Sequence, residues 1–228
     1  MKQSKLPGIF GLLAVLGFLL RRAVYAGAVD EKNLIVSGHP ALIALWVLTA
    51  AVLALAVFAG RKQADRKPGG TKDVSFLGHG ILAAGLLLAA FLNPISTPGV
   101  LGLMWKSLAV LSAVCLLPAG ISRLRGTVPF FALYAAPALF FVGNVVAHYQ
   151  SWCANPQFTD YAFALLGSVM LALHSYQLAA ASLQEENRPV LVSSALAAVF
   201  LCAAAMPRSA YAYLYLGGAV FCLTSVKE

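Results

Sequence analysis

The feature that most constrains the fold of this chain is the recurrence of apolar stretches about as long as a membrane is thick. A helix that crosses the hydrocarbon core of a bilayer, about 30 Å thick, needs about 20 apolar residues. Eight stretches approach this length, with predicted limits of 6–28, 40–60, 74–92, 99–117, 128–149, 158–181, 189–206 and 209–224. The sequence therefore predicts an all-α integral membrane protein, a polytopic bundle of eight transmembrane helices.

The last two stretches leave an alternative of seven spans open. Both are short, and only Pro207 and Arg208 separate them, so they could form a hairpin that does not cross the membrane fully. The composition fits either count, because 61% of the residues are hydrophobic and 11% are charged, whereas soluble proteins carry about 25% charged residues. We expect residues 1–228 to form a single transmembrane domain.

The basic residues predict the orientation of the bundle, because loops on the cytoplasmic side are rich in lysine and arginine. If the N-terminus is cytoplasmic, the basic residues on that side are Lys2, Lys5, Arg61, Lys62, Arg66, Lys67, Lys72, Arg123, Arg125, Arg188 and Lys227. Only Lys32 and Arg208 then lie in loops on the outer side. The net charge of +8 thus indicates orientation and gives no support to nucleic-acid binding. We expect a multi-pass protein of the cell membrane, specifically a bacterial cytoplasmic membrane.

The first stretch resembles a signal peptide, because Lys2 and Lys5 precede an apolar run and residues 26–28 (Ala-Gly-Ala) offer a cleavage site. Arg21 and Arg22 interrupt the path from the apolar run to that site, which favours a retained first helix. Both arginines are predicted near the outer edge. In one interpretation both arginines reach lipid headgroups. In the other, one of them lies with Lys106 in a positively charged vestibule for an anion.

Lys106 is a charged residue within an otherwise apolar stretch. It lies roughly 10 Å below the predicted outer boundary, at about 1.5 Å of rise per residue. A lysine at this depth is tolerated if its stem reaches the headgroups, if it lines a wet cavity, or if a charge on a partner subunit pairs with it. No aspartate or glutamate is predicted at midplane depth to pair with it within the chain.

The sixth stretch carries polar and small residues at spacings of three and four, which places them on one helix face. These residues are Asp160, Phe163, Gly167, Met170, His174 and Gln177. The fifth stretch places Asn144 and His148 on one face in the same way. We expect both faces to point into the bundle. Two interpretations remain open: hydrogen bonds that join helices, or a pathway for a solute or proton.

Four histidines fall into two pairs of similar predicted depth. His79 and His174 lie toward the cytoplasmic side, and His39 and His148 lie near the outer edge. Such pairs are what b-type haem would need, and His79 and His174 are the candidate ligands. The four cysteines are far apart and predict neither a disulfide framework nor a zinc site. No motif of a hydrolase, metalloprotease or phosphate-binding loop is present, so no motif indicates an enzyme.

The leading functional hypothesis is a transporter or membrane solute-binding protein for an anionic or polar small solute. Its cavity would open outward among the fourth to sixth helices. The candidate binding residues are Lys106, Asn144, His148, Asp160, His174, Gln177, Arg21 and Arg22. No cofactor is favoured and no metal site is predicted.

Two alternative functions accompany this hypothesis. The first is a non-catalytic subunit or scaffold, because close pairs of small residues such as Ala50 and Ala54 let helices of a second copy or a membrane partner approach. The second is a haem-binding electron carrier, based on the histidine pairs.

Overall fold

The computed structural model describes residues 6–29, 35–36, 38–62, 72–92, 99–154, 158–185, 187–207 and 209–226. Within these ranges the chain is all-helical, and its only β-type pairing is an isolated bridge between Val29 and Ile35. The helices are α1 (Leu6–Gly27), α2 (Pro40–Lys62), α3 (Lys72–Leu92), α4 (Val100–Arg125), α5 (Ala132–Ala154), α6 (Phe158–Ser182), α7 (Arg188–Ala205) and α8 (Ala212–Ser225). The predicted all-α class is confirmed.

Seven of these helices, α1 to α7, are long and apolar enough to cross a membrane. The remaining helix, α8, has 14 residues and is therefore about 21 Å long, shorter than the bilayer core of about 30 Å. Among the described helices, seven are thus of spanning length, and the eighth is apolar but short. A helical bundle of this kind fits a multi-pass membrane protein.

The limits of several helices differ from the prediction, most of all the end of the fourth helix and both ends of the fifth. The prediction ended the fourth helix at Leu117, before Pro118, but α4 contains this proline and continues to Arg125. It ends at Gly126, whose φ of 74° is left-handed and whose N–H donates to the carbonyl of Arg123. Such a cap satisfies carbonyl groups at the end of the helix. The fifth helix begins at Ala132 instead of residue 128, because residues 127–130 have no regular secondary structure.

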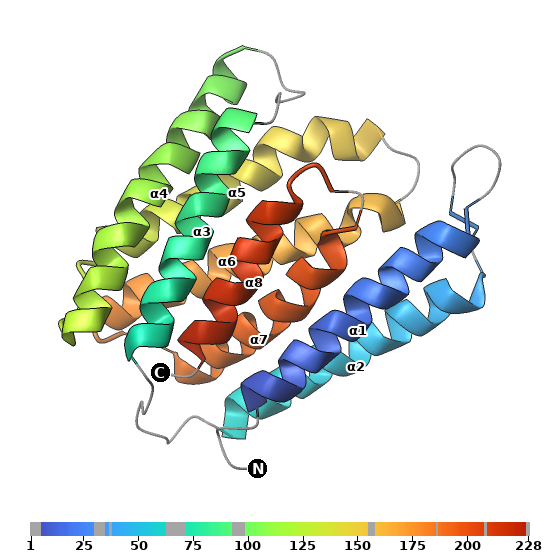
Figure 1. The fold of residues 1–228 in the computed structure, drawn as a ribbon, viewed down its shortest axis with the longest axis horizontal. Coiled ribbons are helices and arrows are strands. Elements are labelled where there is room, and N and C mark those ends of the chain that lie inside the picture. Colours follow the sequence, from blue (N-terminus) through green and yellow to red (C-terminus); the bar gives the residue numbers. More distant parts are fainter. Residues whose placement is uncertain are drawn as a thin grey trace.

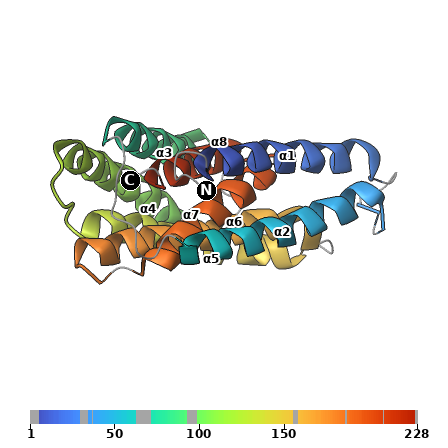
Figure 2. The same cartoon turned by 90° about the horizontal axis from the view of Figure 1, so that it is seen from below.

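The helices α3 to α8 form a closed ring in which each packs on the next, and α8 packs on α3. The α1–α2 hairpin packs outside this ring against α7, which also contacts α6 and α8. Figures 1 and 2 show the hairpin on one side, α3 and α4 on the opposite side, and α7 and α8 between them. The central position of α7 explains its high alanine content, because small side chains allow several helices to approach it.

We call the end of the bundle where α1 begins and α8 ends the terminal end, and the opposite end the far end (Figure 1). The basic residues in or next to the last turns of α2 and α4 and the first turn of α7 all lie at the terminal end; they are Arg61, Lys62, Arg123, Arg125 and Arg188. Near the far end the described basic residues are Arg21, Arg22 and Lys106. More of the described basic residues therefore lie at the terminal end than near the far end.

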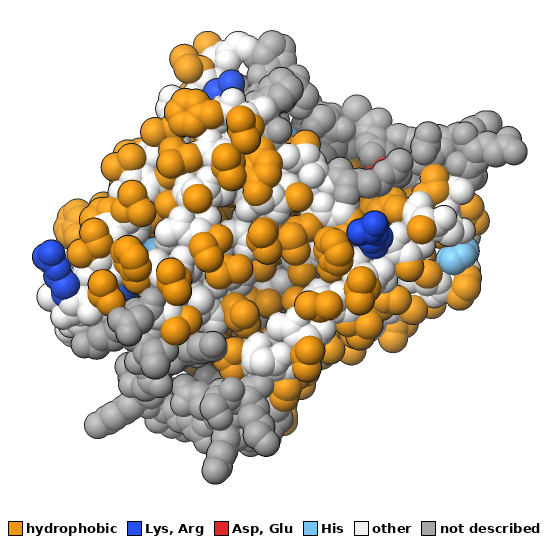
Figure 3. Space-filling model, in the orientation of Figure 1, with side chains coloured by type: hydrophobic (Ala, Val, Ile, Leu, Met, Phe, Trp, Pro, Cys, Tyr) orange, Lys and Arg blue, Asp and Glu red, His pale blue; other side chains and the backbone are white. Residues whose placement is uncertain are grey.

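The outer surface of the bundle is largely apolar. Leu12, Phe91 and Val100 are 73%, 74% and 75% exposed, and such exposure of large apolar side chains is unusual for a protein surrounded by water. Figure 3 shows hydrophobic side chains over most of one face, with lysine and arginine as isolated spots. This surface again fits a multi-pass membrane protein.

Candidate functional site

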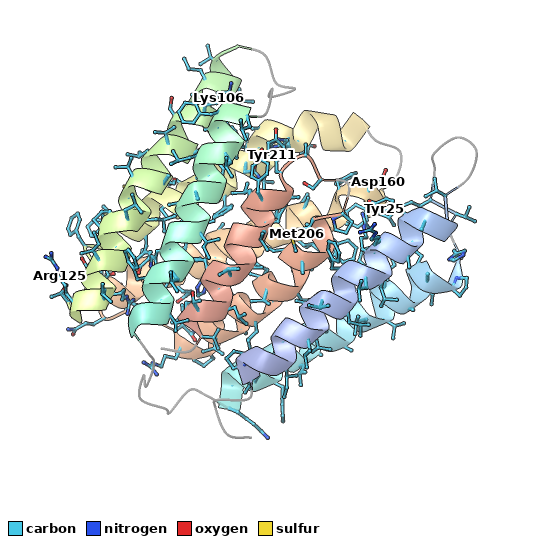
Figure 4. All side chains as sticks on the ribbon, viewed as in Figure 1. Tyr25, Lys106, Arg125, Asp160, Met206 and Tyr211 are labelled. Carbon is cyan, nitrogen blue, oxygen red and sulfur yellow. The ribbon has the colours of Figure 1, made fainter. Side chains whose placement is uncertain are left out.

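A cavity of about 230 Å³ lies at the far end of the bundle, between α1, α5, α6 and the segment that leads into α8. The residues that line it are Tyr25, His148, Asp160, Tyr161, Ala164, Ala205, Pro207, Ser209, Ala210, Tyr211 and Tyr215. Two predicted site residues, His148 and Asp160, are among them. Figure 4 shows Asp160 next to Tyr25, and Tyr211 at the same end of the bundle. This cavity brings together more polar side chains than the second described pocket, which lies between α3 and α4.

Arg21 is buried beside this cavity, with only 2% of its surface exposed. Its Nη2 donates to the hydroxyl of Tyr25 at 2.6 Å and to the carbonyls of Thr159 and Asp160 at 2.5 and 3.1 Å. Its guanidinium carbon lies 4.8 Å from the ring centroids of both Tyr25 and Phe163. Arginine stacks favourably on aromatic faces, so these contacts tie α1 to the first turns of α6.

The Arg21 cluster also positions the carboxylate that lines the cavity. The hydroxyl of Tyr25 accepts from Arg21 and lies 3.4 Å from Oδ1 of Asp160, to which it donates. Nε and Nη1 of Arg21 have no hydrogen-bond partner among the described residues. In one interpretation of the sequence, Arg21 reaches lipid headgroups. In the structure its side chain is instead buried and points into the bundle. The neighbouring Arg22 is exposed, because adjacent helix residues point about 100° apart.

A buried hydrogen-bond network lies directly beneath the cavity. Nε1 of Trp105 donates to Oδ1 of Asn144 at 2.9 Å, and Nδ2 of Asn144 donates to Oγ of Ser168 at 3.0 Å. Oγ of Ser168 lies 3.5 Å from the hydroxyl of Tyr215, which lines the cavity. The network joins α4, α5, α6 and α8, so the amide of Asn144 connects helices and is not itself part of the cavity lining.

His148 connects this network to the cavity. Its Nδ1 lies 2.8 Å from the carbonyl of Asn144, so this nitrogen carries the hydrogen and Nε2 is the acceptor in the neutral ring. The ring makes edge contacts with Tyr211 and Trp105, at centroid distances of 5.1 and 5.9 Å. The aromatic neighbours hold the imidazole in one orientation at the wall of the cavity.

The two candidate haem ligands lie in the other half of the bundle and contact one aromatic ring. The centroids of His79 and His174 are 5.0 and 5.5 Å from that of Phe221. In His79, Nδ1 and Nε2 lie 2.8 Å from the carbonyl of Ser75 and the hydroxyl of Tyr134.

The nitrogens of His174 are occupied in a similar way. Nδ1 lies 3.3 Å from the carbonyl of Leu191, and Nε2 lies 2.8 Å from the hydroxyl of Ser225. Axial haem ligands need a nitrogen directed at the iron. This arrangement of two histidines around Phe221 therefore does not fit haem, and the described residues contain no group of three or more histidine, cysteine or acidic side chains close enough to hold a metal.

The remaining predicted site residues lie apart from the cavity. Gln177 is buried near the terminal end, where its Oε1 accepts from the backbone N–H of Asn187 at 3.2 Å. Lys106 is exposed and borders a separate groove between α3 and α4. The predicted binding residues therefore do not all meet in one cavity. His148 and Asp160 line the far-end cavity, Asn144 and Arg21 contact its lining residues, and the other predicted residues lie elsewhere.

Sequence reasoning did not single out the four tyrosines of the cavity, which are Tyr25, Tyr161, Tyr211 and Tyr215. Tyrosine is common at the membrane interface, so a tyrosine near a helix end does not by itself indicate a site. One signal was available, since Tyr211 and Tyr215 are four residues apart next to a helix start and so share a face. The predicted inward face of α6 is confirmed, because Phe163, Gly167, His174 and Gln177 are buried.

Comparisons of the chain with protein-family models, curated proteins and solved structures give no match. The functional argument therefore rests on the geometry of the cavity and on the surface of the bundle.

Proposed function

We propose that this chain is a multi-pass protein of a bacterial cytoplasmic membrane that binds a small polar solute at its far end, as a transporter or solute-binding protein. The observation that carries the proposal is the far-end cavity, where Asp160 and four tyrosines lie above a buried hydrogen-bond network. Pockets for drug-sized ligands measure about 300–1,000 Å³. A cavity of about 230 Å³ therefore suits a smaller solute.

The charge of the described lining itself favours a positively charged solute over an anion, because the neighbouring cation Arg21 is buried beside the cavity and does not line it. Asp160 is the one carboxylate among the described lining residues, and Lys106, which supported the anion hypothesis, lies elsewhere. Tyrosine hydroxyls accept hydrogen bonds, and tyrosine rings attract cations through their faces. We infer that a small ammonium compound fits this lining better than a carboxylate or phosphate.

The orientation that we propose places the far end outside the cell. The described basic residues at the terminal end then face the cytoplasm, in agreement with the positive-inside rule. The cavity would accordingly receive its solute from the exterior, and a transport cycle would require it to open toward the terminal end as well.

The test uses three probes of similar size and different charge: tetramethylammonium, tert-butanol and pivalate. Calorimetry on the purified protein in nanodiscs should show saturable binding of the ammonium compound alone. Asp160→Asn should weaken this binding by about tenfold, which corresponds to about 1.4 kcal/mol. Tyr176→Ala should leave it unchanged, because Tyr176 is an exposed tyrosine of the same helix. Preferential binding of pivalate, or full binding by Asp160→Asn, would contradict the proposed solute class.

One observation favours the alternative of a non-catalytic membrane subunit. Ala50 and Ala54 are exposed on α2, and small residues on a helix surface allow another helix to approach closely. Purification in a mild detergent separates the two functions. A monomer that binds tetramethylammonium supports the solute-binding proposal, whereas a partner that persists through purification, with no solute binding, supports the subunit.

A further inference from the structure

A second site is formed by the groove between α3 and α4 at the far end. It has a volume of about 670 Å³. Lys106 and Ser107 supply its polar end. Its remaining lining is apolar, with Val110, Leu111 and Val114 on α4 and Phe91 on α3. Ser107 and these three apolar residues of α4 are spaced by three and four, so they form one continuous stripe along the helix.

The charge at the polar end of this groove is not balanced within the described part of the chain. The ammonium group of Lys106 makes no hydrogen bond or ion pair with a described residue, and Lys106 is exposed beside Leu103 and Met104, which are 67% and 55% exposed. Figure 4 shows Lys106 near the far-end limits of α3 and α4. It lies six residues after the start of α4, which is roughly 9 Å along the helix axis. In a membrane, its stem reaches from this depth toward the headgroups.

We propose that this groove binds one anionic phospholipid. The ammonium of Lys106 and the hydroxyl of Ser107 hold the phosphate, and one acyl chain lies along Val110, Leu111 and Val114 with Phe91 on its other side. An anionic lipid fits better than a zwitterionic one, because the headgroup then has no cation of its own to compete with Lys106. The apolar length of the groove requires a lipid and not a free phosphate ion. The proposal needs a membrane position but does not depend on the solute cavity.

The experiment measures lipid retention by native mass spectrometry. The purified protein is titrated with phosphatidylglycerol or with phosphatidylcholine of the same acyl chains. We expect one molecule of phosphatidylglycerol to bind with the higher affinity. Lys106→Met should weaken this binding by about tenfold, as expected for the loss of one charge-assisted contact, whereas Lys106→Arg should retain it.

The matched control is Arg22→Met. Arg22 is also an exposed cation near the far end, but it does not line the groove, so phosphatidylglycerol binding should not change. A thermal unfolding curve of Lys106→Met like that of the wild type shows that the variant is folded. Equal lipid binding by Lys106→Met, or an equal loss in Arg22→Met, overturns the proposal. Displacement of the lipid by inorganic phosphate would reduce the site to a simple anion site and would also overturn it.

Discussion

The guanidinium of Arg21, in α1, lies 4.8 Å from the ring centroid of Phe163, in α6. These residues are far apart in the sequence, and few other contacts join α1 to α6, since the α1–α2 hairpin packs mainly on α7. The buried Arg21 thus joins the α1–α2 hairpin to α6 through its contacts with Thr159, Asp160 and Phe163. These contacts lie next to the cavity that we propose as a solute site.

Arg21→Met should loosen this attachment. The substitution removes the hydrogen bonds to Tyr25 and to the carbonyls of Thr159 and Asp160, so we expect a loss of about 1–3 kcal/mol of stability. In a chain of this size, 1 kcal/mol lowers the unfolding temperature by about 2–4 °C. Thermal unfolding in detergent measures the effect. Arg22→Met is the control, and an equal effect of both substitutions would show that burial of Arg21 contributes nothing.

Gly85→Ala should disrupt the contact between α3 and α8. A β-carbon at Gly85 would lie 2.9 Å from the carbonyl oxygen of Tyr213, whereas one at Gly80, in the same helix, meets nothing within 4 Å. We expect Gly85→Ala to destabilise the protein by about 1–3 kcal/mol through overpacking. Gly80→Ala should be neutral or stabilising by up to about 1 kcal/mol, because alanine favours helices. Similar unfolding temperatures for the two variants would refute the close approach.

The hydrogen bond between Asn144 and Ser168 should appear as an energetic coupling between α5 and α6. In a double-mutant cycle with Asn144→Ala and Ser168→Ala, we expect a coupling of about 0.6 kcal/mol, the average for hydrogen bonds between membrane helices. Unfolding in a series of denaturant concentrations gives the four stabilities. Ser182→Ala replaces Ser168→Ala in the control cycle, because the hydroxyl of Ser182 bonds to Leu178 in its own helix. A coupling as large in the control cycle would argue against a direct bond.

Cys153 offers a test of the orientation. It is exposed in the last turn of α5 at the far end, whereas Cys202 and Cys222 are buried and Cys115 is half-buried. If the far end faces the exterior, a membrane-impermeant maleimide should label intact cells that express the wild type, and Cys153→Ser should remove the label. A cysteine introduced at Thr127, an exposed position at the terminal end, should react only after the cells are permeabilised. The reverse pattern would invert the proposed topology.

Much of the fold followed from the spacing of apolar stretches, because a hydrophobic run of spanning length has few alternatives to a helix. The directions of individual side chains did not follow. Arg21 and Arg22 are adjacent and chemically identical, and only the position of α6 determines which of them is buried. The surroundings of Lys106 could not be predicted either. Lys106 lies beside a groove whose other wall is α3, and the sequence of α4 does not indicate which helix packs there.

The cavity was the least predictable part of the molecule for a similar reason. Its lining comes from α1, α5, α6, the end of α7 and the start of α8. Tyr25 of α1 is far in sequence from the other lining residues, so the complete lining exists only in the assembled bundle. Asp160 and His148 stood out because polar groups are rare in apolar runs. The tyrosines did not, because an amphipathic side chain near a helix end has an ordinary interfacial role.

The pairing of α3 with α8 has a consequence for biogenesis. The last helix emerges from the ribosome long after its main neighbour, and at 14 residues it is too short to be held firmly by lipid alone. In a membrane, we would expect the insertion of α8 to depend on the gap between its packing neighbours α3 and α7. Truncation before Ala212 would leave the faces of α3 and α7 that pack against α8 uncovered.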